Sequence, residues 1–256
     1  MDFETICYKR SFLHQVIIRV DFLEFIPSEL IFSDGVVKCI MKYFTIVGMR
    51  QIMRYNDVNV VLNEKDAKTL SRTQEGFQQE FSNVDRNKII ISNKFVVLEI
   101  NNYSSYEDMI NMFHPILKAI YGSFPINSLR TGIRYINIID NNVIRLTKSL
   151  FSSSVNPLVN TELSKEADGL SCIRSMCMNE YQVKDMRLNF RYGMYNPEYP
   201  SPMRSAKFVL DYDCYCDSLL SGGDAIMAHI EEGHNSIQYL FENAISDTLR
   251  KAMNNE

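Results

Sequence analysis

The chain has 256 residues, of which 46% are hydrophobic and 23% are charged, and its formal net charge is −4. This composition is that of a globular protein rather than a disordered one, and a chain of this length buries roughly three-quarters of its unfolded surface. The small acidic excess excludes a protein that is basic throughout, so nucleic-acid binding would require a local basic patch.

The six cysteines are Cys7, Cys39, Cys172, Cys177, Cys214 and Cys216. A chain of this size does not need disulfides for stability, and its acidic start has no apolar signal core. We therefore expect free thiols in a cytoplasmic protein. No apolar run approaches the roughly 18 residues that span a bilayer, so we also expect the protein to be soluble.

The first part of the chain predicts strands that enclose a broken helix. Val16, Ile18, Val20 and Phe22 alternate with partly polar residues, which predicts a strand over 13–22. A helix should begin at Ser28 and be divided in two near Asp34-Gly35. The sequence then predicts extended segments at 45–62, 70–83, 87–91 and 94–100, followed by a helix at 106–121 that is capped by Ser104 or Ser105 and ended by Gly122 and Pro125.

The same succession is then predicted a second time. A strand at 132–139 is followed by an irregular, partly helical stretch at 143–159 and by strands at 169–179, 182–195 and 206–216. A long helix at 224–253 ends the chain, and its apolar residues form one stripe.

Two short matches indicate an internal duplication. Ile18–Phe22 is similar to Ile133–Asn137, and Phe95–Glu99 is similar to Phe208–Asp211, with order and spacing preserved. The sequence therefore predicts an α+β fold of two similar halves, 1–128 and 129–256, within one compact unit. Each half would run strand, helix, antiparallel strands, helix, and together they would form a curved antiparallel sheet with helices on one side. This topology resembles the tandem halves of TATA-box-binding-protein-like folds, a likeness that implies no function.

Two histidines near the chain's end are candidate metal ligands. His229 and His234 are five residues apart, about 140° around a helix, whereas a zinc-protease helix places its two histidines four residues apart. We therefore expect them to serve different helix faces, and we expect no metal site and no cofactor.

The segment 211–217 alternates acids with small or aromatic residues. Asp211, Asp213 and Asp217 would share one face of a strand, with Cys214 and Cys216 on the other. A row of acids can bind a hard cation, but it is more typical of the solvated side of an outer strand, which is our interpretation here.

Arginines and aromatic residues interleave between positions 187 and 204. This pattern suits stacking on bases and equally suits a protein-binding hot spot. The candidate binding residues are Arg187, Arg191, Tyr192, Tyr195, Tyr199 and Arg204. Because the net charge is negative, a protein partner is favoured over nucleic acid. No catalytic residues are predicted, since the sequence has no Gly-x-Ser-x-Gly elbow, phosphate-binding loop or dinucleotide fingerprint.

Three motifs together resemble an uncharacterised family of sporadically distributed bacterial and archaeal proteins of similar length. They are Val16–Phe22, Thr131–Asn137 and His234–Arg250. The resemblance transfers no catalytic residue. Sporadic distribution is typical of genes that travel with defence islands and toxin–antitoxin loci, and this setting is what the resemblance implies.

The leading hypothesis is therefore a non-enzymatic, protein-binding component of a prokaryotic defence or toxin–antitoxin system, whose partner would be a toxin or defence effector. One alternative is a nucleic-acid or nucleotide binder that uses a basic, aromatic surface. Another is a hydrolase with an unfamiliar site at His229 or His234 together with Asp211 or Asp213. The oligomeric state is not predicted, and no membrane association is expected.

Overall fold

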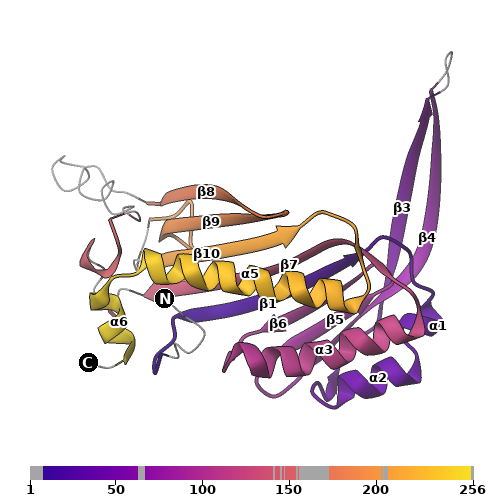
Figure 1. Ribbon diagram of the computed structural model, residues 1–256, viewed down its shortest axis with the longest axis horizontal. Helices are drawn as coiled ribbons and strands as arrows, with labels where there is room; N and C mark the ends of the chain where they lie inside the picture. Colours follow the sequence, from indigo (N-terminus) through magenta and orange to yellow (C-terminus); the bar gives the residue numbers. More distant parts are fainter. Residues whose placement is uncertain are drawn as a thin grey trace.

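The computed structural model is an α+β structure built on one large antiparallel sheet (Figure 1). It describes residues 8–62, 67–140, 142–144, 146, 148–153, 155, 173–202, 204 and 207–254, without the side chains of 57–62 and 67–72. The strands are β1 (Leu13–Phe22), β2 (Ile46–Val47), β3 (Gln51–Leu62), β4 (Ala67–Ser82), β5 (Lys88–Ser92), β6 (Phe95–Ile100), β7 (Asn127–Asp140), β8 (Ser175–Val183), β9 (Met186–Tyr195), β10 (Lys207–Cys216) and β11 (Leu220–Ser221). They lie in the order β2-β4-β5-β6-β1-β7-β10-β9-β8, with β3 on β4 and β11 on β7.

The centre of the sheet is the antiparallel pair β1 and β7. Ile18 of β1 lies opposite Ile133 of β7. On the other side of β1, Ile18 lies opposite Leu98 of β6, and on the other side of β7, Ile133 lies opposite Cys214 of β10. All four residues are buried. Because side chains alternate between faces along a strand, this register places one apolar row across four strands on a single face.

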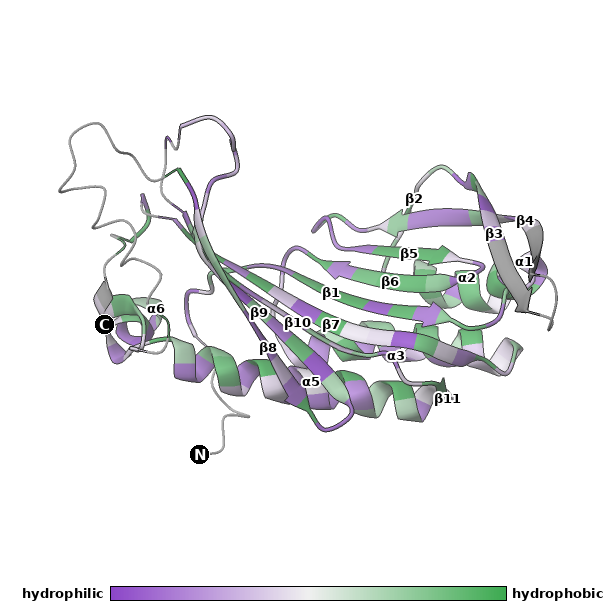
Figure 2. Cartoon of the chain, turned by 90° about the horizontal axis from the view of Figure 1, so that it is seen from above, coloured by the Kyte–Doolittle hydropathy of each residue, from purple (hydrophilic) through white to green (hydrophobic). Residues whose placement is uncertain are grey.

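Two long helices cover that apolar face (Figures 1 and 2). They are α3 (Tyr106–Ser123) and α5 (Gly223–Ala244), and α1 (Ser28–Ile31) and α2 (Asp34–Met41) pack beside α3. The predicted cap of α3 is confirmed, since the Ser105 hydroxyl accepts a hydrogen bond of 3.0 Å from the Asp108 amide. Helix α3 ends at Ser123, and the residue before Pro125 is extended, because a proline disfavours helical geometry at its predecessor. Each fully buried Ile, Leu or Phe contributes about 1.5–3 kcal/mol.

A long hairpin of β3 and β4 projects from one end of the sheet (Figure 1). Only the 78–82 part of β4 pairs with β5, so the hairpin leaves the sheet near Gly76. Asn93 holds this point, since its side chain accepts 2.6 Å from the Phe77 amide and donates 2.6 Å to the Ile26 carbonyl. A side chain at position 76 would lie 2.4 Å from the Asn93 Oδ1, which explains the glycine.

The single C-terminal helix predicted at 224–253 is wrong, because the structure has two helices there. Helix α5 ends at Ala244, Ile245 is extended, and α6 (Asp247–Asn254) follows. Ile245 forms a bridge with Phe151, and the Ser246 amide donates 3.0 Å to the Leu150 carbonyl of the short 3₁₀ helix η1 (Lys148–Leu150). The Ile245 amide keeps its helical bond to the Phe241 carbonyl, but the Ser246 amide donates to a distant carbonyl instead, so tertiary contacts override the local helical pattern.

Helix α6 is tied to the start of the described chain. The Tyr8 hydroxyl lies 2.8 Å from both carboxylate oxygens of Glu242, a side chain that is only 3% exposed. The Arg250 Nε donates to the same carboxylate at 3.1 Å, and the Arg10 amide donates 2.8 Å to the Met253 carbonyl. The buried charge of Glu242 is thus paired, as stability requires.

The described cysteines are Cys39, Cys177, Cys214 and Cys216, and all four are free thiols as predicted. Cys7, Cys172 and part of the irregular stretch predicted at 143–159 lie outside the described residues, as does the beginning of the strand predicted at 169–179. Within the described part of the chain, no helix combines the length and apolar character needed to cross a membrane.

Candidate functional site

The face of the sheet opposite α3 and α5, here called the open face, carries polar and aromatic side chains from four adjacent strands. They occupy the positions between the buried apolar residues of each strand. One row across the four strands consists of residues that lie opposite one another in turn: Arg19 of β1, Gly132 of β7, Tyr215 of β10 and Arg187 of β9. The set comprises Arg19 and Asp21, Arg130, Gly132 and Arg134, Asp211, Asp213 and Tyr215, and Arg187 and Arg191.

A network of ion pairs lies in the middle of the open face. Arg134 donates two hydrogen bonds to Asp211, from Nε at 2.7 Å and from Nη2 at 2.8 Å. Arg191 reaches the same carboxylate at 3.1 Å and Asp213 at 3.5 Å. The Asp211 side chain is only 9% exposed, so two arginines share one buried carboxylate. Paired, fork-like geometry of this kind fixes the side chains in one arrangement.

Beside this network the open face is hollowed. The hollow has a volume of about 360 Å³ and is lined by Ile17, Arg19, Asp21, Arg130, Gly132, Arg134, Asp213 and Tyr215. The Arg130 guanidinium stacks on the Tyr215 ring at 4.0 Å, an arrangement that holds a cation over the face of an aromatic ring. Burial raises the pKa of Asp213, and the three neighbouring arginines oppose that effect.

Gly132 of β7 lets Tyr215 of β10 lie close to the β7 backbone at the floor of the hollow. A Cβ at position 132 would lie 2.9 Å from the Tyr215 Cβ and 3.1 Å from the Cys214 carbonyl oxygen. Both contacts are closer than normal packing allows. The hollow therefore keeps its shape only if position 132 has no side chain.

Each arginine of the open face has an acidic partner. The ion pairs beyond the central network are Arg19 with Asp21 at 2.8 Å, Arg130 with Asp217 at 3.8 Å and Arg187 with Glu180 at 3.8 Å. The surface is therefore rich in arginine but balanced in charge. Such a surface lacks the uncompensated positive field on which phosphate binding depends.

The candidate binding residues from the sequence are divided by the structure. Arg187 and Arg191 lie on the open face, as does their strand neighbour Tyr195 at the end of β9, which is 39% exposed. Tyr192 points to the opposite face, where it is buried and stacks on Phe190 at 4.7 Å. The expected gathering of these residues on one surface is therefore only partial.

The other two candidates lie in the loop after β9. The Tyr199 ring is 52% exposed and receives the guanidinium of Arg174 at 4.4 Å. The Arg204 side chain is 86% exposed and pairs with Glu198 at 3.3 Å. Arg204 is thus engaged within the loop itself and Tyr199 by the residue before β8, and neither belongs to the central network.

The hydrolase site proposed from sequence is not assembled. Asp211 and Asp213 face the open side of the sheet, whereas His229 and His234 belong to α5, which covers the other side. The interpretation of the acidic row as the solvated side of an outer strand is also wrong, because β10 lies inside the sheet between β7 and β9. Asp211 is buried by its partners there.

His229 and His234 serve different faces of α5, as predicted. His229 Nε2 lies 3.0 Å from Asp185, while His234 Nδ1 lies 2.9 Å from the Tyr135 hydroxyl. The His234 ring also stacks on Tyr106 with 3.9 Å between centroids. Burial lowers the pKa of His234 to about 4, so the ring is neutral near pH 7 and shares one hydrogen bond with the Tyr135 hydroxyl.

Sequence reasoning missed six residues of the open face: Arg19, Asp21, Arg130, Gly132, Arg134 and Tyr215. The signal that could have found Arg19 and Arg134 is the match between Ile18–Phe22 and Ile133–Asn137, which places these two arginines at equivalent strand positions between buried residues. Comparisons with protein-family models, curated proteins and solved structures found no match to this chain.

Replacing Gly132 with alanine should destabilise the protein by about 1–3 kcal/mol, because the new methyl group must displace Tyr215 or the backbone of β10. Urea unfolding measures the change. Gly35→Ala is the matched control, since a Cβ there meets open space in a helix, and it should leave stability unchanged or raise it slightly. Equal effects of the two substitutions would contradict the close packing at Gly132.

Acidification should destabilise the fold through His234. Its pKa is lower in the folded than in the unfolded state, so its contribution is complete above about pH 6.5 and is lost towards about pH 4. The loss should amount to up to about 3 kcal/mol. Unfolding free energies measured across this pH range should fall less steeply for His234→Gln than for the parent. The exposed-site control His14→Gln should keep the parental slope, and a parental slope in His234→Gln would contradict the assignment.

Proposed function

We propose that this protein is a non-enzymatic binding protein that holds another protein on its open face. The observation that carries this proposal is the charge-balanced arginine and aromatic surface centred on Asp211 and the hollow beside it. Arginine and tyrosine are the residues that most often dominate the energy of protein interfaces. Here they are already oriented by ion pairs and ring stacking, so little side-chain freedom is lost when a partner binds.

A protein partner suits this surface better than a nucleic acid. Nucleic-acid affinity comes largely from Lys and Arg side chains that neutralise phosphates, and the open-face arginines pair with carboxylates of the same chain. A protein surface of mixed charge can instead exchange ion pairs with the rim of the hollow while it buries Tyr215 and Ile17. The nucleotide-binding alternative is therefore not favoured.

The proposed setting is a prokaryotic defence or toxin–antitoxin system, in which the protein neutralises or assists an effector. This part of the proposal comes from the resemblance of Val16–Phe22, Thr131–Asn137 and His234–Arg250 to the sporadically distributed family. A preformed sheet face is compatible with such a role because it binds without prior folding.

The test is capture of partners from the native host with two matched double variants. Arg130→Ala/Tyr215→Ala removes the stacked pair at the hollow, and Tyr199→Ala/Arg204→Ala removes the same residue types from the loop after β9. The parent should retain a stoichiometric protein partner. With that partner purified, the hollow variant should bind about thirtyfold more weakly or worse, while the loop variant should bind as the parent does.

Three outcomes would contradict the proposal. They are no stoichiometric protein partner for the parent, equal binding by the hollow variant and the parent, and loss of binding in the loop variant alone. Binding to single-stranded or duplex DNA that weakens steeply with salt would instead support the nucleic-acid alternative.

We also propose that the chain arose by internal duplication. In support, β6, β5 and β4 follow β1 on one side of the centre, and β10, β9 and β8 follow β7 on the other. Helices α3 and α5 come after β6 and β10, respectively. Sequences of relatives from distant hosts should then align half against half, with β1 of one on β7 of another. Relatives without any such half-to-half similarity would contradict the duplication.

A further inference from the structure

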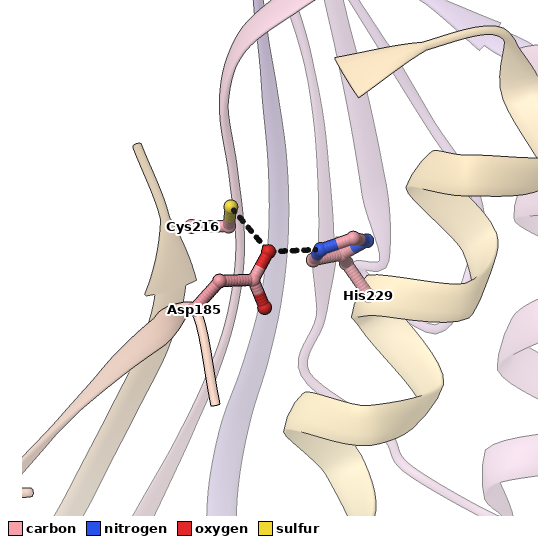
Figure 3. A group of neighbouring side chains, drawn as sticks. All are labelled: Asp185, Cys216 and His229. Atoms are coloured by element: carbon pink, nitrogen blue, oxygen red, sulfur yellow. Dashed lines mark hydrogen bonds and ion pairs between the residues drawn. The ribbon is translucent and has the colours of Figure 1, made fainter. Parts of the chain in front are cut away.

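Three side chains from distant parts of the chain converge where the β8–β9 turn meets the start of α5 (Figure 3). They are Asp185 in the turn, Cys216 at the end of β10 and His229 in α5. Asp185 Oδ2 lies 3.0 Å from His229 Nε2 and 3.9 Å from Cys216 Sγ. All three potential ligand atoms lie within 4.8 Å of one another. A carboxylate, a thiol and an imidazole thus point to one place.

The orientation of His229 is that of a metal ligand. Its Nδ1 lies 2.8 Å from the Ala225 carbonyl oxygen, which can only accept a hydrogen bond, so Nδ1 carries the proton. In the neutral ring, Nε2 then presents its lone pair towards the carboxylate of Asp185. Two acceptors facing each other repel unless a proton or a metal ion lies between them. A backbone carbonyl that fixes the far ring nitrogen is typical of histidines that bind metals.

Cys216 is also prepared to act as a ligand. Its side chain is buried, and its sulfur accepts a hydrogen bond of 3.4 Å from the Ser218 amide. The thiolate is the form of cysteine that binds metals, and the Ser218 amide would remain a hydrogen-bond donor to a zinc-bound sulfur. The nearest cationic neighbour in sequence, Lys184, is engaged by Glu232 at 2.7 Å. Lys184 therefore leaves the Asp185 carboxylate to the cluster.

We propose that Asp185, Cys216 and His229 bind a zinc ion. Thiolate, imidazole and carboxylate are the three ligand types of zinc, whereas magnesium and calcium require oxygen ligands. In a tetrahedral site with bonds of about 2.0–2.3 Å, neighbouring ligand atoms are roughly 3.5 Å apart, within the range of separations in this cluster. The Asp185 side chain is 53% exposed, so water can reach the fourth position.

The zinc ion would tie α5 to two neighbouring segments of the sheet that it covers. The tip of the β8–β9 hairpin, the end of β10 and the start of α5 would be fixed by one ion. The spacing of His229 and His234 concealed this site in the sequence, because the second histidine belongs to a different pocket and the other ligands lie 13 and 44 residues before His229.

The site is tested on the full chain, purified under reducing conditions and stripped with a chelator. Cobalt(II) is the spectroscopic probe, since it replaces zinc and gives a thiolate-to-metal absorption band only when a cysteine binds it. One equivalent of cobalt should produce the band, and zinc should then remove it by displacement. Zinc should also raise the melting temperature of the stripped protein.

Single substitutions assign the ligands. Asp185→Asn at a half-exposed position should fold normally and bind at least about tenfold more weakly, and His229→Gln should do the same. Cys216→Ser should abolish the band. Cys214→Ser, the other buried cysteine of β10, and Asp217→Asn, an exposed acid next to the site, are the matched controls and should bind as the parent does.

The proposal is overturned if the parent gives no thiolate band with cobalt, if Cys216→Ser keeps the band, or if Asp185→Asn binds as tightly as Asp217→Asn. Circular dichroism of each variant verifies folding. If Cys216→Ser does not fold, Asp185→Asn and His229→Gln decide the question. If Asp185 and His229 formed only an ion pair, neither substitution would change the affinity for the metal.

Discussion

The composition of both faces of the sheet depends on the pairing of β1 with β7 in a single register. With Ile18 opposite Ile133, the fully buried apolar residues of both strands turn towards α3 and α5, and Arg19, Arg130 and Arg134 turn the other way. A slip of one residue would exchange the two faces of a strand and place arginines under the helices. The buried row, the helix packing and the composition of the open face are therefore consequences of one alignment.

Within the open face, the Asp211 carboxylate sets the positions of the other charges. Arg134 and Arg191 reach it from the two neighbouring strands, so a single acid on β10 orients basic side chains from β7 and β9. A buried ion pair adds little net stability compared with apolar packing, but leaving one partner alone is costly. The network is better understood as fixing a surface than as holding the fold together. It gives the open face a defined pattern of charge.

The strands and helices with a strong apolar period could be predicted from sequence, as β1 and α3 show. The end of α5 could not, because Ile245 and Ser246 leave the helix to meet Phe151 and Leu150, and no glycine or proline marks the break. The composition of β9 indicated Arg187 and Arg191, but the partner of Arg134 is 77 residues away and depends on the β7–β10 register. Asp185 was missed for the same reason, since its two neighbours, Cys216 and His229, come from two other segments of the chain.

The contacts of Tyr8 with Glu242 and of Arg10 with Met253 have a consequence for biosynthesis. Tyr8 and Glu242 are 234 residues apart, and a ribosome needs roughly ten to fifty seconds to make the chain between them. For part of that time β1 has β6 on one side and an unpaired edge on the other, since β7 is synthesised later. Such a long-range closure makes folding slow once synthesis is complete. During synthesis an apolar edge of the sheet is therefore exposed, first at β1 until β7 is made and then at β7 until β10 is made.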